Sequence, residues 1–349
     1  MAKIKAGIIG ATGYAGGELV RLLIGHPVVE LIWLGSRSYA GQSYAEVFRN
    51  MNGESEDVCR LDDMAALAED ADVIFTATPQ GFCAGVLDEE ILCKAKIIDL
   101  SADYRMKDPD VYESWYGIHH ASPQFLPEAV YGLCELNRSE IAKARIVANP
   151  GCYTTCSILA LWPLVKEGLV DPSTIVIDAK SGVSGAGRGE KLANLFCEVN
   201  ENTKAYGVGT HRHTPEIEEQ LSAAAGRQIT LNFTPHLIPM NRGILITAYA
   251  NRTDSSVSES TVCEAFAKYY RDESFIRLLQ PGVCPETKWV EGSNYTDIGF
   301  YVDERTGRII AMGALDNLVK GAAGQAVQNM NIVFGLPENT GLRQIPLFP

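Results

Sequence analysis

The sequence lacks the long apolar runs that form membrane helices. No stretch of its 349 residues reaches the ~18 consecutive apolar residues that a membrane span requires. The first residues, MAKIKAGIIGATG, contain no apolar core and no cleavage site of a signal peptide. Internal repeats and low-complexity segments are absent as well. We therefore expect a globular, cytoplasmic protein that has no membrane partner.

Basic residues are fewer than acidic ones. The chain has 30 Lys and Arg against 43 Asp and Glu, a formal net charge of −13. A negative field of this kind repels nucleic acid and anionic membrane surfaces, so we expect neither as a partner. It does not exclude an anionic small substrate, because such a site needs only local arginines and backbone N–H groups.

Regular cysteine spacing is also missing. The nine cysteines are an odd number scattered along the chain, which argues against a disulfide scaffold and for a reducing compartment. No Cys-x-x-Cys pair is present, and His211 and His213 have no evident third ligand. We therefore predict that the protein has no metal site.

The length favours two domains, the first an α/β domain with a Rossmann-type parallel sheet. Short apolar runs alternate with helical patterns over residues 1–149, as in doubly wound sheets. We expect strands over residues 4–9, 29–34, 73–77 and 96–100. A helix is expected over residues 317–334, and the segment 317–349 should complete this first domain.

Residues 150–316 have a different texture, with longer loops and alternating apolar stretches. We expect a helix over 155–166 and strands over 174–179, 228–237 and 243–250. This pattern predicts an α+β domain with a mixed, mostly antiparallel sheet, used for catalysis, substrate binding and oligomerisation.

A glycine-rich motif, GATGYAG, follows the first expected strand and opens the first helix. This is the position of a dinucleotide fingerprint, in which glycines let the backbone approach a pyrophosphate at a helix N-terminus. The predicted cofactor contacts are Gly10, Ala11, Thr12, Gly13, Tyr14 and Gly16.

The end of the second expected strand indicates which dinucleotide binds. Ser36 and Arg37 stand there, and a hydroxyl with a guanidinium suits a 2′-phosphate. Glu30 has the spacing of an NAD-type acid, but it lies at the start of that strand. We therefore predict NADP(H) as the cofactor. The alternative is that Arg37 is simply a solvated loop residue.

Cys152 is the candidate nucleophile. It follows an apolar strand and the turn Asn149-Pro150-Gly151, where a helix is expected to begin. A thiol at a helix N-terminus is partly thiolate at neutral pH. Most cysteines are small buried hydrophobes, and we interpret the other eight, including Cys156, in this way.

Thiol chemistry also needs a group that moves protons. The segment His211-Arg212-His213 lies in an expected polar loop over residues 207–216. Two histidines and an arginine together favour a catalytic role, but the residues alone do not decide between His211 and His213.

The surroundings of Cys152, NPGCY, resemble the active-site signature of the N-acetyl-γ-glutamyl-phosphate reductase family, relatives of aspartate-semialdehyde dehydrogenase. Similar blocks run through nearly the whole chain: GATGYAG (10–16), SRSYAG (36–41), DLSADYR (99–105), SGVSGAGR (181–188), HRHTPEIE (211–218), HLIPMNRGI (236–244) and DNLVKGAAGQAVQNMN (316–331). The one departure is Thr154-Thr155-Cys156, where the family often has Pro or Ala before Thr-Ala or Thr-Gly. This departure concerns local helix packing only.

The resemblance implies roles for individual residues. Cys152 would be the nucleophile and His211 the acid/base. Ser184 and Gly185 would lie near the nicotinamide, and Asn317 near its carboxamide. The implied substrate contacts are Arg105, Asn149, Arg188, Tyr206 and Arg212. For Arg105 the alternative is a salt bridge with Asp103 or Asp108.

The resemblance also implies the activity. The family reduces N-acetyl-γ-glutamyl phosphate with NADPH to N-acetylglutamate 5-semialdehyde, releasing phosphate through a cysteine thioester in arginine biosynthesis. Its members are NADP-dependent phosphorylating aldehyde dehydrogenases that self-associate, so we expect a homodimer or homotetramer. Three alternatives stay open: the same chemistry on aspartyl phosphate, the same chemistry on a longer or carrier-linked acyl phosphate, and a non-catalytic NADP-binding thiol sensor.

Overall fold

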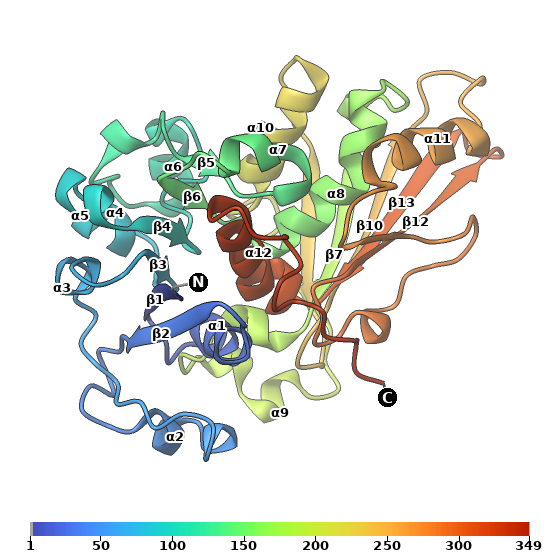
Figure 1. The fold of residues 1–349 in the computed structure, drawn as a ribbon. Helices are drawn as coiled ribbons and strands as arrows, with labels where there is room; N and C mark the ends of the chain where they lie inside the picture. The colour runs from blue at the N-terminus through green and yellow to red at the C-terminus, as the bar shows by residue number, and fades with distance from the viewer. Residues whose placement is uncertain (1–2, 349) are drawn as a thin grey trace. The chain divides into compact units, whose positions relative to one another are not determined.

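The computed structural model describes residues 3–348, which divide into two compact units (Figure 1). The first unit consists of Met1–Pro150 and Ala322–Arg343, and the second of Gly151–Gly321 and Gln344–Pro349. The chain thus passes from one unit to the other directly before the segment that carries Cys152, and returns after Gly321.

The first unit contains a six-stranded parallel sheet, in the order β2-β1-β3-β4-β6-β5. Its strands are β1 Ile4–Ile9, β2 Val29–Leu34, β3 Val73–Thr76, β4 Lys96–Asp99, β5 Val130–Tyr131 and β6 Ile146–Ala148. Its helices are α1 Tyr14–Ile24, α2 Tyr44–Val47, α3 Met64–Ala68, α4 Phe82–Val86, α5 Glu89–Lys94, α6 Pro109–Tyr116, α7 Cys134–Ile141 and α12 Gly324–Val333. The predicted Rossmann-type parallel sheet is confirmed.

The parallel strands form because their residues are apolar without alternation. All four residues of β3 are buried, and β4 is buried after its first residue. A strand covered by helices on both faces buries both sets of side chains, which a continuous apolar run allows. The strands predicted over 4–9 and 29–34 have the bounds found in β1 and β2, whereas β3 and β4 each end one residue earlier than expected.

The second unit contains a seven-stranded mixed sheet, in the order β11-β12-β13-β10-β7-β9-β8. Its strands are β7 Val176–Ser181, β8 Lys204–Ala205, β9 Asn232–Leu237, β10 Ile244–Asn251, β11 Ile276–Leu278, β12 Thr296–Asp303 and β13 Arg308–Leu315. Only the pairs β11–β12 and β7–β9 are parallel among its pairings. The predicted mixed, mostly antiparallel sheet is confirmed.

Four α-helices accompany this sheet: α8 Cys152–Lys166, α9 Phe196–Val199, α10 Thr214–Ala225 and α11 Glu259–Tyr270. Helix α8 is apolar on nearly every side and packs against β10, β13, α10 and α11. A helix of this composition is stable only inside a core. It begins at Cys152, as the turn Asn149-Pro150-Gly151 predicts, and three residues before the apolar helical pattern expected over 155–166.

The single helix expected over 317–334 is not regular throughout. A π-helix, η7 Val319–Ala323, precedes α12. The buried carboxylate of Asp316 accepts hydrogen bonds from the backbone of Leu318 and Val319, which reshapes the start of the segment. Short 3-10 helices complete the secondary structure: Arg49–Met51, Pro123–Phe125, Pro172–Thr174, Val183–Ala186, Leu192–Asn194 and Thr287–Trp289.

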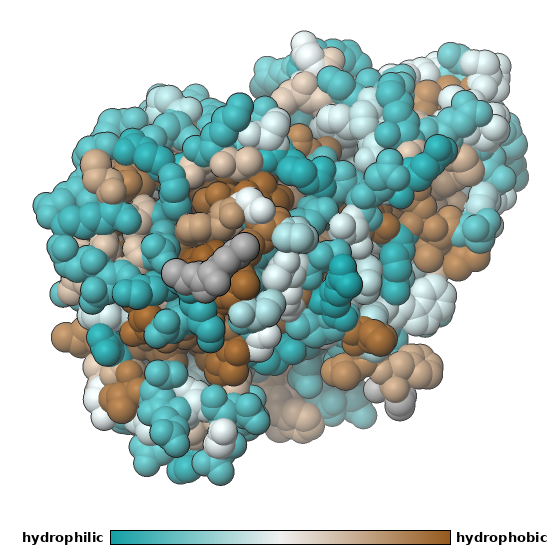
Figure 2. Space-filling view, viewed as in Figure 1, coloured by the Kyte–Doolittle hydropathy of each residue, from teal (hydrophilic) through white to brown (hydrophobic). Residues whose placement is uncertain are grey.

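The surface drawn in Figure 2 is largely hydrophilic, with apolar groups gathered in separate patches. Across residues 3–348, no helix has the length and apolar character needed to cross a bilayer.

Candidate active site

The GATGYAG motif spans the turn after β1 and the first three residues of α1. Gly10 has a φ of +80°, and a Cβ on Gly16 would overlap the carbonyl oxygen of Gly10. Both positions therefore need glycine. Gly13 is the N-cap of α1, and neither a side-chain cap nor an acidic residue occupies the first turn. The free end of this helix suits a phosphate group.

Ser36 and Arg37 follow β2, beside this turn. The hydroxyls of Thr12 and Ser36 are 2.8 Å apart, and Ser36 Oγ also accepts from the backbone N–H of Tyr39. The side chain of Arg37 is 69% exposed, so its guanidinium is accessible to an anion. Glu30 is exposed near the opposite end of β2. The position of Arg37 fits a 2′-phosphate contact, which stays a prediction.

Asp62 is a residue of this region that sequence reasoning missed. Its buried carboxylate accepts from the backbone N–H of Gly10 at 2.9 Å, and Oδ2 lies 3.9 Å from Nε of Arg37. Burial raises the pKa of Asp62, while Gly10 and Arg37 oppose this shift. Asp62 therefore ties the glycine turn to the arginine. No local motif marks it, because its partners lie far away in the sequence.

Arg105 is buried and contacts backbone carbonyl groups. Its Nε donates to the carbonyl of Asn149 at 2.8 Å, and Nη2 donates to that of Leu100 at 2.7 Å. Asp103 accepts from the backbone of Gly81 and Ala84. These contacts make Arg105 an anchor for the end of β6. A direct contact between Arg105 and substrate stays a prediction.

The side chain of Asn149 is also buried and engaged. Its Nδ2 donates to the carbonyl of Ala322, and its Oδ1 accepts from Nδ2 of Asn329, both at 3.1 Å. The amide therefore fixes the end of β6 to the segment that leads into α12.

Cys152 is the first residue of α8 and is half-buried. The preceding Gly151 is the N-cap, and its N–H donates to Oε1 of Glu216 at 2.9 Å. Thr154 Oγ1 donates to the same oxygen at 2.8 Å. Since Gly151 is engaged, the N–H groups of Cys152 and Tyr153 are the candidates for holding an oxyanion at this helix end.

Glu216 is a second residue that sequence reasoning missed. It is almost completely buried in the first turn of α10, which begins at Thr214 inside the segment expected to be a loop. Its carboxylate holds the N-terminal turn of α8, far away in the sequence. The HRHTPEIE block contains Glu216, but nothing local indicates its partner.

His211 lies among aromatic rings. Its ring centroid is 5.7 Å from that of Tyr153, 5.4 Å from that of Tyr206 and 5.3 Å from that of Phe233. Burial, with a smaller contribution from Arg212, lowers the pKa of His211 to about 4. Its imidazole is therefore neutral at physiological pH.

The tautomer of His211 follows from one hydrogen bond. The backbone N–H of His213 donates to Nδ1 of His211 at 3.2 Å. The neutral ring then carries its proton on Nε2, which can donate to a substrate oxygen. His213 itself is the N-cap of α10, with its ring 4.9 Å from that of His211.

Tyr206 contacts His211 and Tyr153, the residue after Cys152. Its hydroxyl donates to that of Tyr153 at 3.3 Å, and Tyr153 donates to the carbonyl of His236. Burial of the hydroxyl raises the pKa of Tyr206 to about 12, and Cys152 adds to this shift electrostatically. Tyr206 is thus protonated at neutral pH and lies within electrostatic range of Cys152.

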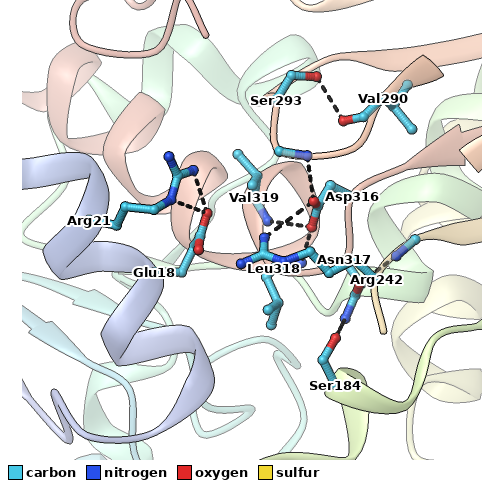
Figure 3. A network of polar contacts seen from close by, with 12 residues as sticks. Glu18, Arg21, Ser184, Arg242, Val290, Ser293, Asp316, Asn317, Leu318 and Val319 are labelled. Atoms are coloured by element: carbon cyan, nitrogen blue, oxygen red, sulfur yellow. Dashed lines mark hydrogen bonds and ion pairs between the residues drawn. The ribbon is translucent and has the colours of Figure 1, made fainter. Parts of the chain in front are cut away.

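The three residues expected near the nicotinamide lie together in the second unit. Asn317 Nδ2 donates to Oγ of Ser184 at 2.9 Å, as Figure 3 shows. Its Oδ1 accepts from the backbone of Gly243 at 2.8 Å. A Cβ on Gly185 would lie 3.7 Å from Nδ2 of Asn317. Gly185 is exposed beside this pair.

Arg188 and Arg212 are both exposed. Either guanidinium could receive an anionic group of a substrate, and the assignment of each stays a prediction. Within residues 3–348, no group of three or more His, Cys, Asp or Glu side chains is arranged to hold a metal ion.

The described geometry therefore gives two sets of residues, each inside its own unit. The glycine turn, Ser36 and Arg37 belong to the first unit, as do Arg105 and Asn149. The second unit contains Cys152, Tyr206 and His211, and also Ser184, Gly185 and Asn317. Such a division is typical of enzymes in which one domain binds a dinucleotide and another carries the residues that react with the substrate.

Family models match both units. The model of the semialdehyde dehydrogenase NAD binding domain matches residues 5–144, and that of the semialdehyde dehydrogenase dimerisation domain matches residues 152–317. The structure of aspartate semialdehyde dehydrogenase with NADP from Candida albicans aligns with a TM-score of 0.71 and 16% identity, over 97% of this chain and 100% of that one. Aspartate semialdehyde dehydrogenase II from Vibrio cholerae aligns with a TM-score of 0.70 and 18% identity, over 95% and 99%. The chain has the fold of the semialdehyde dehydrogenases, a class of oxidoreductases.

Closer relatives define the family within this class. N-acetyl-gamma-glutamyl-phosphate reductase of Lachnospira eligens is 66% identical over 99% of this chain and all of its own length. The enzymes of the same name from Lachnoclostridium phytofermentans and from a Campylobacter jejuni strain are 64% and 57% identical, over 99% and 98% of this chain and 100% and 98% of their own. The chain belongs to the N-acetyl-γ-glutamyl-phosphate reductase family, which confirms the resemblance inferred from its motifs.

Proposed function

We propose that this chain reduces N-acetyl-γ-glutamyl phosphate to N-acetylglutamate 5-semialdehyde with NADPH, releasing phosphate, as a step of arginine biosynthesis. The observation that carries the proposal is the position of Cys152, half-buried as the first residue of α8, in a chain of this family. We also propose that the first unit binds the dinucleotide and the second unit the acyl phosphate.

The first chemical step belongs to Cys152. Its thiolate attacks the acyl carbon, and the N–H groups of Cys152 and Tyr153 hold the oxyanion that forms. The bond between the acyl carbon and the phosphate oxygen then breaks. Phosphate leaves with that electron pair, and the acyl group stays on sulfur as a thioester. A thioester accepts hydride more readily than an oxygen ester, which explains why sulfur serves here.

Bound NADPH supplies a hydride to the thioester carbon. His211 faces the oxygen that becomes negative in this step, with its proton on Nε2. In the free enzyme His211 is neutral because its pKa is about 4. An anionic substrate beside the ring raises that pKa, so a larger fraction of His211 takes up a second proton from solvent and can give one to this oxygen. Collapse of the thiohemiacetal releases the aldehyde and regenerates the thiol.

Residues of the first unit would hold NADP(H). The GATGYAG turn and the N-terminus of α1 suit the pyrophosphate, and Ser36 with Arg37 suits the 2′-phosphate. Ser184, Gly185 and Asn317 would lie at the nicotinamide. Arg188 and Arg212 are the proposed contacts for the phosphate and carboxylate groups of the substrate.

We further propose that the protein acts in the cytoplasm as a homodimer or homotetramer. Strand β10 buries every second residue and leaves the residues between them half-exposed. A sheet face of this kind is available to a second copy of the chain. The size of the assembly can be measured by sedimentation at several protein concentrations.

The reverse reaction tests the activity. Enzyme, inorganic phosphate and NADP⁺ are mixed with one of three semialdehydes, derived from N-acetylglutamate, aspartate or N-acetylaminoadipate, and NADPH absorbance is followed. We expect phosphate-dependent reduction of NADP⁺ that is fastest with N-acetylglutamate semialdehyde. One methylene changes recognition by only about 1–3 kcal/mol, so the comparison needs kcat/KM values for each substrate. A higher kcat/KM for another semialdehyde, or a rate independent of phosphate, contradicts the proposal.

A further inference from the structure

The first turn of α8 rests on two glycines from different elements of the second unit. A Cβ on Gly321 would lie 2.7 Å from Cβ of Cys152, and a Cβ on Gly313 would lie 2.9 Å from Sγ of Cys156. Contacts this short are not tolerated between real side chains, so this packing needs glycine at both positions. Because Cys152 and Cys156 are one helical turn apart, they lie on the same face of α8.

The segment that carries Gly321 is fixed by Asp316. The buried carboxylate accepts at Oδ1 from the backbone N–H of Leu318 at 2.8 Å and of Val319 at 3.2 Å (Figure 3). The N–H of Gly321 donates to the carbonyl of Asp316 at 2.9 Å. This bond spans five residues and defines the π-type turn over residues 316–321. The turn determines where Gly321 meets Cys152.

The same turn is tied to the residues proposed for the nicotinamide. Asp316 Oδ2 accepts from the backbone of Gly292 at 2.8 Å and lies 3.3 Å from Nη1 of Arg242. The next residue, Asn317, bonds to Ser184 and to the backbone of Gly243. One short turn therefore contacts the nucleophile at Gly321 and the nicotinamide-side residues at Asn317.

We propose that Gly321 is a positioning residue for the reduction, and that Gly313 supports the next turn of the same helix through its contact with Cys156. Together with the turn over residues 316–321, these glycines set where the sulfur of Cys152 lies relative to Ser184 and Asn317. Gly321 has no reacting group and acts only through its contact with Cys152. The inference rests on the proposed role of Cys152 as the nucleophile.

The substitution Gly321→Ala tests the contact in the full-length enzyme. The added methyl displaces Cys152, and a shift of about 1 Å can lower the rate by about 10²-fold. We expect kcat to fall by that order while the KM for NADPH stays unchanged. NADPH binding, followed by nucleotide fluorescence, verifies the fold of the first unit, and a urea unfolding curve verifies that of the second unit.

Gly85→Ala is the matched control. Gly85 lies in helix α4, and a Cβ there would meet nothing within 4 Å. This variant should keep the kcat of the wild type. A wild-type kcat in a folded Gly321→Ala variant would overturn the inference.

A suppressor pair separates positioning from a general loss of stability. Gly313→Ala should also lower kcat, because its methyl meets Sγ of Cys156. Adding Cys156→Ala removes that sulfur, and the remaining contacts of the methyl are 3.4 and 3.5 Å. The double variant should regain the kcat of Cys156→Ala alone. Cys156→Ala should not restore Gly321→Ala, whose contact is with Cys152.

Two results of this pair oppose the inference: failure of Cys156→Ala to restore Gly313→Ala, or equal restoration of both glycine variants. The pair stays decisive even where Gly321→Ala does not fold. Cys152→Ser distinguishes this inference from the proposed function. Full activity of Cys152→Ser would show that Cys152 is not the nucleophile and would overturn the inference as well. If Cys152→Ser is inactive while Gly321→Ala keeps the kcat of the wild type, only the positioning role is overturned.

Discussion

Each unit contains a helix whose N-cap is a glycine, but the two units use that helix end differently. In the first unit β1 leads through Gly10–Gly16 into α1, whose first turn has neither a side-chain cap nor an acid. In the second unit, α8 begins directly after Gly151, and the N–H group of Gly151 donates to the carboxylate of Glu216. One helix end is left open for a ligand's phosphate, whereas the other is partly filled so that it holds a reactive side chain in place.

The largest effect in this comparison is expected at Cys152. Cys152→Ser should lower kcat by about 10³-fold or more, because a hydroxyl at this helix end is a much poorer nucleophile. The dissociation constant for NADPH should stay unchanged, since the proposed dinucleotide contacts belong to the other helix end. Steady-state kinetics and nucleotide fluorescence measure the two quantities. Cys93, Cys197 and Cys284 are exposed, so the expectation that the other eight cysteines are buried is wrong for these three. Cys197 supplies the control, and Cys197→Ser should behave as the wild type.

His211→Ala should have the next largest effect, a fall in kcat of about 10²-fold to 10⁴-fold with unchanged NADPH binding. The His211 ring has a lowered pKa of about 4, so it loses its proton on Nδ1 well below neutral pH. The pH dependence of kcat/KM should therefore show the ionisation of His211 near pH 4 and not near pH 6.5. The His211→Ala variant should lack this ionisation. A larger loss in His213→Ala would assign the acid/base role to His213.

Arg37→Ala probes the open helix end of the first unit. A charge-assisted hydrogen bond contributes about 1.5–3 kcal/mol, so the KM for NADPH should rise by about 10-fold to 10²-fold. The KM for NADH should stay nearly constant, because NADH has no 2′-phosphate. Equal changes for both nucleotides would mean that Arg37 does not contact the 2′-phosphate.

Glu216 probes the filled helix end. Glu216→Ala leaves the N–H of Gly151 and the hydroxyl of Thr154 without this acceptor, at a cost of about 1–3 kcal/mol in the free energy of unfolding. Glu216→Gln keeps an acceptor oxygen at this position and should lose less. Urea unfolding curves compare the two variants. Equal stability of Glu216→Ala and the wild type would show that this carboxylate is not needed to hold α8.

Local features of the sequence predict where both helices, α1 and α8, begin. The strand before each turn is a continuous apolar run, and the glycines mark the turns, so β1, β2 and the start of α1 follow from a few neighbouring residues. The Asn-Pro-Gly turn correctly predicts that a helix begins at Cys152, three residues before the apolar pattern of α8 starts.

The parts that could not be predicted depend on distant partners. Glu216 and Asp62 each hold a glycine turn far away in the sequence, and neither has a local signal. The π-helix near Asp316 replaces part of an expected regular helix, because a buried carboxylate takes up two backbone donors. Strands β12 and β13 were not located either, since their place is set by pairing with each other and with β10.

The contact between Gly321 and Cys152 has a consequence for the newly made protein. Residue 321 leaves the ribosome only after nearly all of the chain has been synthesised, and domains fold as their segments become available. Helix α8 packs against β10 and β13, and its reactive end cannot be seated until the turn over residues 316–321 arrives. The enzyme therefore acquires an ordered thiol only when its synthesis is almost complete.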